Sequence, residues 1–500
     1  MRQLWGFRFR RTTLWLIGCT AILAGIGWAH FERAPVGNWM VLLAVLSVWF
    51  GRRRSLLSAC LVCLICFAFG WWRGSLYMQK LDSYQALYMQ KVTLTARAID
   101  DGVYGTNSQM SFEANQVRLS NGQGLAGKIQ LSGFGMNAVF QGDEVQASGK
   151  MYSAYGAYQG RISFAQLQLI AHHDTVVAEV RRHFTAGMQS ALPEPLAPFA
   201  MGLLVGQRAT LPKDTKQDLL MVGLTHIIAV SGYNLTIMLH ASRKLLARRS
   251  KRLNTALSLG LMAVFLLIAG ASASIVRAAI VSMLSIATLY YGRYMKPLNL
   301  IMMAAALTAW VNPFYIWSDT SWYLSFLAFF GVMLLAPLLA NRLRPSWRNS
   351  LIAMVALESL CAELLTMPFV LWTFGQMSFI GLPANVMVVT LVPLAMLLSL
   401  AAGLSGMLVG PIAGWLSWPA SMLLTYMLDI AHLLARVPHI FAQHIGLTML
   451  QMVVLYGILA AICLLLKTKT KLQLTDIITD KKSVSRRGVA LERSQQMVNN

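Results

Sequence analysis

Lys and Arg clusters fall on alternate gaps between twelve apolar stretches, and this pattern constrains the fold of the chain more than any other feature. The clusters lie at residues 8–11, 52–54, 243–252, 293–296, 342–348 and 467–471. The gaps between them contain almost no Lys or Arg. Basic residues in short loops stay on the cytoplasmic side of a membrane. The pattern predicts a polytopic α-helical membrane protein with about 12 transmembrane segments and both termini in the cytoplasm.

The composition excludes an ordinary soluble protein. Apolar residues make up 56% of the 500 residues and charged residues only 12%, whereas soluble proteins average about 25% charged. A net charge of +23 is compatible with binding nucleic acid. However, residues 73–182 hold ten Lys and Arg against eight Asp and Glu. The positive excess therefore lies in the loops between apolar stretches and serves first as an orientation signal.

The basic clusters orient each predicted span. The first three spans cover residues 14–29, 39–50 and 56–72, so that the chain leaves the membrane outward. Residues 73–191 are then extracytoplasmic. Nine further spans follow at residues 219–240, 257–273, 275–291, 300–310, 322–340, 351–371, 384–404, 412–431 and 447–466. The gap at 406–411 is assigned to the cytoplasm without a supporting charge, and the polar tail 467–500 is predicted to be disordered. This predicts a multi-pass protein of the cytoplasmic (inner) membrane.

The extracytoplasmic region changes from helical to strand periodicity. Five segments alternate apolar and polar residues, at 91–98, 110–119, 128–132, 144–150 and 161–169. Glycine-containing turn signals separate them. Five short strands predict a small closed barrel such as an OB-fold, and a small sandwich is the competing architecture. An amphipathic helix is predicted at 176–192.

The densest polar group in a predicted span is Gly223-Leu-Thr-His226-Ile-Ile-Ala-Val-Ser231-Gly232-Tyr233-Asn234. On a helix, His226, Ser231 and Asn234 fall within about 140° of one another. Polar groups at bilayer depth are expensive and are functional candidates by default. One interpretation is a face that lines a water-filled cavity. The alternative is packing of small and polar residues between helices.

Arg277 lies inside a predicted span, near its outer end. It could extend its guanidinium outward, pair with an acid such as Glu358 or Glu363, or meet a phosphate in a pore. Asp319 is expected to be an ordinary solvated residue of an external loop.

A third polar group begins at Glu358 and Glu363 and continues through Pro368 and Phe374-Gly-Gln376 to Leu382-Pro-Ala-Asn385. Broken helices that line a cavity are one explanation of a proline-bearing span next to a loop without Lys or Arg. A simple proline kink is the other.

Catalytic motifs are absent from the sequence. None of the nine His residues belongs to an H-x-H-x-D-H or H-E-x-x-H pattern, and no P-loop occurs. We therefore expect a chain without nuclease, ATPase or metallohydrolase activity, and with no metal or cofactor.

Several motifs together resemble the ComEC family of competence proteins. They occur in that family's order and comprise Gly202-Leu-Leu-Val-Gly206-Gln-Arg208, the Gly223–Gly232 segment, Ala271-Ser-Ala-Ser-Ile-Val-Arg277, Asn312-Pro313, Leu324-Ser325-Phe326 and Pro383-Ala-Asn385. The resemblance covers residues 14–466 and implies four segments. These are a three-span N-terminal part (1–72), an OB-like domain with its helix (73–191), a transmembrane channel domain (192–466) and a basic cytoplasmic tail (467–500).

The resemblance implies uptake of single-stranded DNA into the cytoplasm during natural transformation. The pore-lining candidates are His226, Ser231, Gly232, Tyr233, Asn234, Arg277, Glu363 and Asn385. For the outer domain the implied role is to bind the strand by stacking on aromatic residues. These candidates include Tyr104, Phe112, Tyr152, Tyr155 and Tyr158, with Phe134 and Phe140 beside them. Packing of these rings inside the barrel is the alternative.

The sequence departs from the family at three places. Tyr233 and Asn234 follow Ser-Gly where an apolar residue and His are common, and Ser321-Trp322-Tyr323 replaces a Gly-Phe-Gln. Many members also end in a metallo-β-lactamase-like domain, whereas 34 residues follow the last span here. We expect a form that lacks this domain, so that a separate polypeptide would supply any nuclease.

A passive pore implies partners besides the lipid bilayer. These are single-stranded DNA, an extracytoplasmic DNA receptor and a cytoplasmic ATPase motor. A secondary transporter for a small polar or anionic solute is the alternative function. A scaffold for envelope assembly is a third class.

Overall fold

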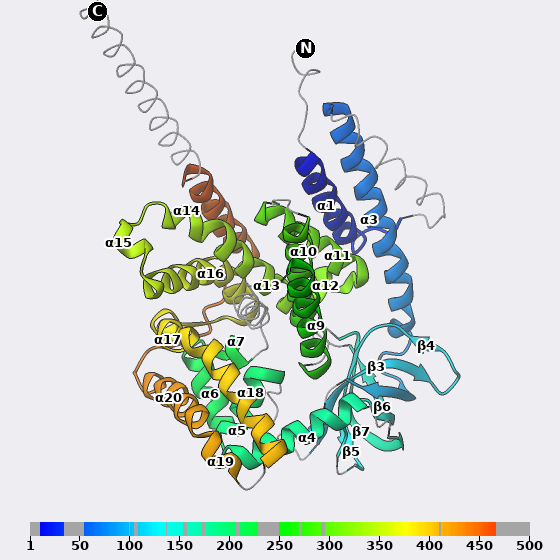
Figure 1. Ribbon diagram of the computed structural model, residues 1–500. Coiled ribbons are helices and arrows are strands. Elements are labelled where there is room, and N and C mark those ends of the chain that lie inside the picture. Colours follow the sequence, from blue (N-terminus) through cyan, green and yellow to red (C-terminus); the bar gives the residue numbers. More distant parts are fainter. Residues whose placement is uncertain are drawn as a thin grey trace, which may run out of the picture. The chain divides into compact units, whose positions relative to one another are not determined.

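The computed structural model describes residues 11–34, 55–99, 101–104, 109–136, 138–153, 158–172, 176–206, 211–228, 250–269, 273–291, 296–409 and 412–466 (Figure 1). The chain forms two compact units. The first comprises Met1–Phe326 and Ser378–Ile440, and the second comprises Leu327–Met377 and Phe441–Asn500. This division follows helix packing. The four-segment organisation inferred from the sequence stays a prediction.

Five of the described helices are long and apolar enough to cross a membrane, judged by length and composition. They are Leu56–Gln85, Thr320–Ala340, Ile352–Phe374, Gly381–Val409 and Met449–Leu466. Shorter apolar helices are Thr12–Trp28, Leu196–Val205, Ile275–Thr288 and Pro297–Val311. The membrane protein expected from the hydropathy pattern is therefore confirmed. The spans at 39–50 and most of 219–240 lie outside the described residues, and the total of twelve stays a prediction.

The first two described helices run parallel to each other. They are α1 (Arg11–Trp28) and α3 (Leu56–Gln85). A Cβ on Gly18 would lie 3.4 Å from Cys66 Sγ, and one on Gly74 would lie 2.5 Å from Ala29 Cβ. Contacts thus progress in the same direction along both helices. Two parallel helices are compatible with the span predicted between them at 39–50, which lies outside the described residues.

Helix α11 (Pro297–Val311) and the short α12 (Phe314–Ser318) lie along α1. Near one end of α1, Asn299 Nδ2 donates to the Thr12 carbonyl at 3.2 Å. Near the other end, Trp317 Nε1 donates to the Ile26 carbonyl at 3.0 Å. Helix α9 (Lys251–Ala269) contacts α10 (Ala273–Tyr290), and α10 contacts α11. Through these contacts α9, α10 and α11 follow one another as neighbours, and α11 packs on α1.

Five long strands follow α3 and close into a barrel. They are β1 (Lys91–Ala98), β3 (Met110–Leu119), β5 (Ile129–Phe134), β6 (Glu144–Tyr152) and β7 (Gly160–Ala171). The order β1-β6-β7-β5-β3 is closed by the pairing of β3 with β1, and only β5 and β7 pair in parallel within this ring. The short strands β2 (Val103–Tyr104) and β4 (Gly124–Leu125) attach to β3. The closed barrel is confirmed, and the alternative small sandwich is wrong.

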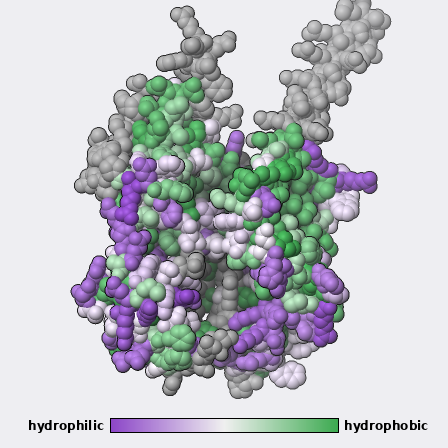
Figure 2. Space-filling model, turned by 180° about the vertical axis from the view of Figure 1, so that it is seen from behind, coloured by the Kyte–Doolittle hydropathy of each residue, from purple (hydrophilic) through white to green (hydrophobic). Residues whose placement is uncertain are grey.

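Strand alternation fills the barrel interior. On β1, for example, exposed or half-buried residues alternate with buried ones from Lys91 to Ala98. Tyr84, from the last turn of α3, also lies in this core and is 1% exposed. Figure 2 shows apolar residues over α1 and α3 at the upper left and hydrophilic residues over the barrel below them. The helix therefore leads from an apolar surface into a water-facing domain.

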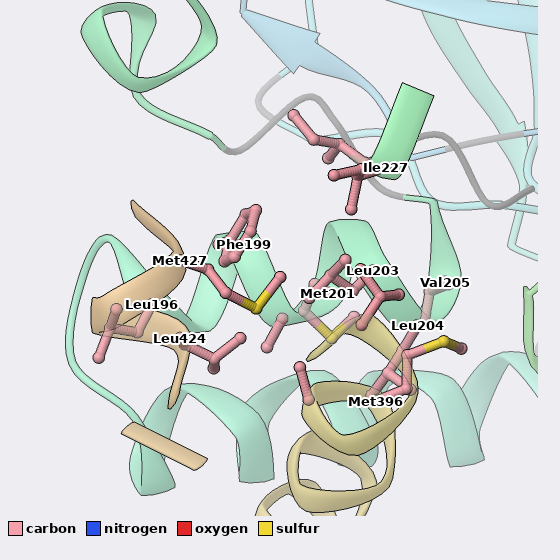
Figure 3. Packing of buried hydrophobic residues seen from close by; sticks show 14 of the residues in the cluster. Leu196, Phe199, Met201, Leu203, Leu204, Val205, Ile227, Met396, Leu424 and Met427 are labelled. Atoms are coloured by element: carbon pink, nitrogen blue, oxygen red, sulfur yellow. The ribbon is translucent and has the colours of Figure 1, made fainter. Parts of the chain in front are cut away.

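The remaining helices of this unit share one hydrophobic core with α5 (Leu196–Val205), and we call them the α5 bundle. They are α4 (Val176–Ala191), α6 (Lys213–Met221), α7 (Thr225–Ile228), α17 (Gly381–Val388), the 3₁₀ turn η2 (Val389–Leu391), α18 (Val392–Val409), α19 (Ala413–Leu416) and α20 (Trp418–Ala435). All ten residues of α5 are buried. Figure 3 shows Phe199 and Met427 converging, with Met396 of α18 below Leu204. Because α5 is apolar all round, neighbours must cover every face.

The contact between α4 and α18 conflicts with a pair of sequence predictions. A Cβ on Gly406 would overlap the carbonyl of Gly187 in α4. The Ser417 hydroxyl donates to the Ala191 carbonyl at the end of α4. The end of α18 therefore lies on the side of α4, so α4 cannot be extracytoplasmic while residues 406–411 are cytoplasmic. The described end of α18, residues 406–409, carries no Lys or Arg, and we assign it to the same side as α4.

The second unit contains helices only, apart from a short strand pair, among its described residues. The helices are α13 (Thr320–Phe330) at the boundary, the π-helical η1 (Gly331–Leu335), α14 (Ala336–Ala340), α15 (Pro345–Arg348), α16 (Leu351–Phe374) and the helix Met449–Leu466. The pair consists of β8 (Gln376–Ser378) and β9 (Phe441–Gln443). Helix α16 continues through Pro368. The break expected from the broken-helix interpretation therefore does not occur at this proline.

Candidate functional site

The turn before α7 positions His226, the first of the pore-lining candidates. Gly223 has a φ of +78°, which L-residues with a side chain rarely adopt, so glycine is suited to this turn. His226 Nδ1 lies 3.1 Å from the Gly223 carbonyl, and its side chain is exposed. The candidates Ser231, Gly232, Tyr233 and Asn234 lie outside the described residues. The shared helix face predicted for this segment therefore stays a prediction.

The same turn contacts the loop that precedes α17. A Cβ on Gly223 would lie 3.3 Å from Ser378 Cβ and 3.5 Å from Gly381 Cα. Asn385 lies one helical turn beyond Gly381. Two polar groups that are about 150 residues apart in the sequence thus meet at one place. We call Gly223, His226, Ser378, Gly381 and Asn385 the polar junction.

The polar junction contains unused hydrogen-bonding capacity. Ser378 Oγ and Asn385 Oδ1 are buried, and neither has a hydrogen-bond partner among the described residues. An unsatisfied polar atom in an apolar surrounding is costly, so such atoms usually contact water or a ligand. The arrangement fits a hydrated site inside the unit. Ser378 was not singled out in the sequence, because a lone serine after a strand-like segment carries no periodic signal.

Arg277 is completely buried and contacts the loop between α12 and α13. Its Nη2 donates to the Ser321 carbonyl at 2.9 Å and to the Ser321 hydroxyl at 3.1 Å. Its Nη1 lies 3.9 Å from Asp319 Oδ2. The expected pairing with an acid is therefore found, with Asp319 as the acid in place of the suggested Glu358 or Glu363. The expectation that the guanidinium extends outward to solvent is wrong, because the side chain is completely buried.

Asp319 is a buried residue that begins a helix, and the expectation of a solvated loop residue is wrong. It is 3% exposed. Its Oδ1 accepts from the backbone N–H of Ser321 at 2.9 Å and of Trp322 at 3.3 Å, as an N-cap does. Burial raises the pKa of the Asp319 carboxyl, and the neighbouring Arg277 opposes this shift. The ion pair therefore links the start of α13 to α10.

The Arg277–Asp319 pair is incompletely hydrogen-bonded. Arg277 Nε and Nη1 and Asp319 Oδ2 are buried without hydrogen-bond partners among the described residues. A separation of 3.9 Å is beyond hydrogen-bonding range. As the side chains stand, the guanidinium is covered by protein, which argues against direct contact with a passing phosphate. The pair can instead set the packing of two membrane helices.

The two acids of α16 lie in the second unit. Glu358 lines a cavity of about 220 Å³ together with residues that include Asn341 and Arg348. Glu363 is half-buried, and its Oε2 has no hydrogen-bond partner among the described residues. Glu363, one of the pore-lining candidates, is therefore partly buried, and one of its carboxylate oxygens has no partner among the described residues. A residue that faces a hydrated space would have these properties. Its place in a pore stays a prediction.

The aromatic candidates of the barrel fall into different environments. Phe112 is 4% exposed and packs in the barrel core, so its assignment to a binding surface is corrected. Tyr152 is half-buried under the Lys150 ammonium, 5.9 Å from the ring centroid. The Tyr158 hydroxyl donates to Glu113 at 2.5 Å. The side chain of Tyr104 and all of Tyr155 lie outside the described residues.

Two of the exposed phenyl rings, Phe134 and Phe140, were among the aromatic residues considered from the sequence, and the third, Phe164, was not. Phe164 is 68% exposed, Phe134 is 47% exposed and Phe140 is 37% exposed. Strict alternation from Ile162 would point Phe164 into the core. Instead the pairing of β5 with β7 shifts between Leu131 and Gly133, and Phe164 takes a φ of +58° at this irregularity. Such a bulge reverses the side-chain face and leaves Ala165 inside. No sequence period reveals it.

Within the described ranges, no three His, Cys, Asp or Glu side chains are grouped closely enough to hold a metal ion. The candidate sites among the described residues are the polar junction, the buried Arg277–Asp319 pair and the aromatic surface of the barrel. These sites can form hydrogen bonds, hold helices together and stack on planar rings.

Comparison with known proteins agrees with the resemblance seen in the sequence. The Competence protein family matches residues 203–469, which is more than half of the 500-residue chain. ComE operon protein 3 of Bacillus subtilis (strain 168) is 23% identical over 229 residues. That alignment covers 45% of this chain and 29% of the relative. No solved structure matches the chain. On the strength of the match over residues 203–469, this chain belongs to the competence protein family, the ComEC family.

Proposed function

We propose that this protein takes part in DNA uptake and forms the membrane passage through which single-stranded DNA enters the cytoplasm during natural transformation. The observation that carries the proposal is the family match over residues 203–469, which includes the polar junction and Arg277. The apolar helices and the barrel support it, because uptake requires both a membrane part and a part that meets DNA outside.

The barrel is proposed as the outer, DNA-facing part. Its five-stranded closed ring with one parallel pair is compatible with an OB-fold, an architecture whose surface binds oligonucleotides. The barrel is joined to the membrane helices through α3, whose Tyr84 fills the barrel core. A strand bound on the barrel would therefore be held close to the membrane part.

The polar junction is proposed as part of the passage. Its buried acceptors on Ser378 and Asn385 would contact water or the strand, and the chain continues from His226 into Ser231, Gly232, Tyr233 and Asn234. Arg277 is proposed to hold the helices that border the passage rather than to touch phosphate.

The remaining roles are proposed to belong to other polypeptides. We expect no catalytic activity in this chain, so a cytoplasmic ATPase would pull the strand and a receptor would deliver DNA from outside. A separate nuclease would degrade the other strand. The expected location is the cytoplasmic membrane, with both termini inside.

Deletion of the gene, with fluorescent DNA supplied outside, tests the proposal. We expect labelled DNA to stay at the cell surface and fail to reach the cytosol, and transformants to disappear. Normal transformation in the deletion strain would exclude the channel. Thiol accessibility refines the test in a chain whose six native Cys are replaced. Ser231→Cys should react with an aqueous thiol reagent, whereas Ser399→Cys, at a completely buried position, should not.

A further inference from the structure

One end of the barrel is covered by the end of α3. Tyr84 contacts the first residue of β7, Gly160, with its ring 3.4 Å from where a Cβ would lie. The Tyr88 hydroxyl donates to the carbonyl of Gln159, just before β7. Strands β5 and β7 both begin at this end and run in parallel away from it. Residues near the ends of these strands therefore lie far from the point where α3 enters.

Two exposed phenyl rings lie on these two strands. In the pairing of β5 with β7, Phe134 is opposite Gln166, so Phe164 is its diagonal neighbour two residues away. Diagonal neighbours in a sheet are about 7–8 Å apart, which long aromatic side chains can span. Both side chains are exposed, so both lie on the outer surface of the barrel.

The backbone at Phe164 is unfavourable for a phenylalanine. Its φ of +58° lies in the left-handed region that favours glycine. Glycine there would remove the strain and also remove an exposed apolar ring. Phe164 thus lowers stability through its strained backbone and through the exposure of an apolar ring to water. Residues of this kind are typical of binding sites.

The surroundings of the two rings are polar and weakly charged. Gln130 and Ser132 on β5 and Gln166 on β7 alternate with buried residues and so face outward, and Arg161 is exposed on β7. Amide and hydroxyl groups beside aromatic faces suit unpaired bases, which offer both ring faces and hydrogen-bonding edges.

A lipid surface does not fit this place. Phe134 is five steps along the strand from Ile129, which corresponds to roughly 17 Å in an extended strand. The rings thus lie well away from the barrel end that joins α3. A DNA duplex does not fit either, because its bases are stacked on each other and offer no free faces to Phe134 and Phe164.

We propose that Phe134 and Phe164 form an aromatic clamp that stacks on the bases of single-stranded DNA before the strand enters the membrane part. This inference rests on the proposed function and identifies where the outer domain would hold its substrate. The clamp would be indifferent to sequence, because every base offers a ring face.

The test uses the full chain in lipid nanodiscs and a fluorescent oligothymidine of about 16 nucleotides, the upper end of the range bound by one OB-fold. Fluorescence anisotropy at low salt gives the affinity. We expect Phe134→Ser and Phe164→Ser each to weaken binding by about fivefold or more. The matched control is Ile170→Ser, which removes an exposed aliphatic side chain of β7 and should leave binding unchanged.

Two further variants separate stacking from folding. Phe134→Trp should bind as well as the unchanged chain or better, because a larger ring remains. Phe164→Gly should raise the thermal midpoint of unfolding, since it relieves the backbone, and yet weaken DNA binding. A stabler protein that binds DNA worse is an outcome that a purely structural role of Phe164 would not produce.

The clamp is wrong if the double serine variant binds the oligonucleotide as the unchanged chain does, or if Ile170→Ser weakens binding equally. It is also wrong if the unchanged chain binds soluble glycan fragments through these rings and no DNA at low salt. None of these outcomes decides the uptake role, because the deletion experiment tests that role separately.

Discussion

Replacing Arg277 alone should destabilise the protein far more than replacing Arg277 together with Asp319. Arg277→Met keeps an unbranched, flexible apolar stem and removes the charged guanidinium. The side chains of this pair are 0% and 4% exposed. Losing one partner of a buried ion pair costs about 3–5 kcal/mol, because the other charge stays buried and unpaired.

The second change neutralises that stranded charge. Asp319→Asn keeps the oxygen that caps α13, which accepts from Ser321 and Trp322. Replacing both members of a buried pair by uncharged groups is often close to neutral. Because Nη1 and Oδ2 are 3.9 Å apart and have no hydrogen-bond partners among the described residues, this pair gains less than an ideal one. We expect the double variant Arg277→Met/Asp319→Asn to recover about 2–4 kcal/mol relative to Arg277→Met alone.

Reversible unfolding in mixed micelles, followed by tryptophan fluorescence, measures these differences. The pH dependence of stability is an independent test, because the direction of its change is predicted. Without Arg277, burial should hold the pKa of Asp319 above its unfolded value, so the folded state binds more protons than the unfolded state in the pH range between the two pKa values. Stability of Arg277→Met should therefore rise as the pH falls toward the ordinary carboxyl range, and the double variant should not show this rise. Equal stability of the single and double variants at neutral pH would refute the reasoning.

The functional readout follows from the same pair. If Arg277 holds helices rather than phosphate, the double variant should retain much of the DNA uptake that Arg277→Met loses through misfolding. Uptake that is abolished in a stable, folded double variant would instead favour direct contact between the guanidinium and DNA.

Three further predictions address topology and packing. The first concerns topology and uses a chain whose native Cys are replaced. A membrane-impermeant thiol reagent should modify Gly414→Cys from the same side of the membrane as Asn121→Cys in the barrel, and not from the side that modifies Ser346→Cys. Reaction from the side of Ser346 would restore the cytoplasmic assignment. Gly406→Leu should separate α4 from α18 and lower the thermal midpoint, whereas Gly414→Leu should be tolerated because a Cβ there meets no heavy atom of the described residues within 4 Å; equal effects would refute the close crossing. Phe112→Ala should destabilise the barrel by about 3–5 kcal/mol in chemical denaturation, and a loss of DNA affinity with unchanged stability would show that its ring is a surface contact after all.

Local periodicity was sufficient for the barrel strands. Residues 91–98 and 110–119 were predicted from alternation, and β1 and β3 cover the same residues. The amphipathic helix predicted at 176–192 corresponds to α4, which ends one residue earlier. These elements are local, because the side-chain period of a strand or helix is set by the backbone and by a single buried face.

The partners of individual polar residues were not predictable in the same way. For Arg277 the sequence left three partners open, namely solvent, an acid such as Glu358 or Glu363, and a phosphate, and in the structure the guanidinium meets Asp319 and Ser321. Asp319 was expected in water because it lies in a loop, yet α10 and α13 bury it. The sequence shows that a charged residue lies in an apolar segment, where burial is costly. It does not show which distant residues will pair with that charge.

The sequence alone determined that this is a membrane protein with a β-domain between its apolar helices, because hydropathy, charge placement and strand alternation are properties of short segments. The tertiary structure decided which segments meet. Three features depend on segments of the chain that are distant in sequence. They are the contact of Gly223 with Ser378, the crossing of α4 with α18, and the outward orientation of Phe164. Such contacts depend on close packing and on hydrogen bonding throughout the folded unit. The periodicity of a single segment carries no information about either.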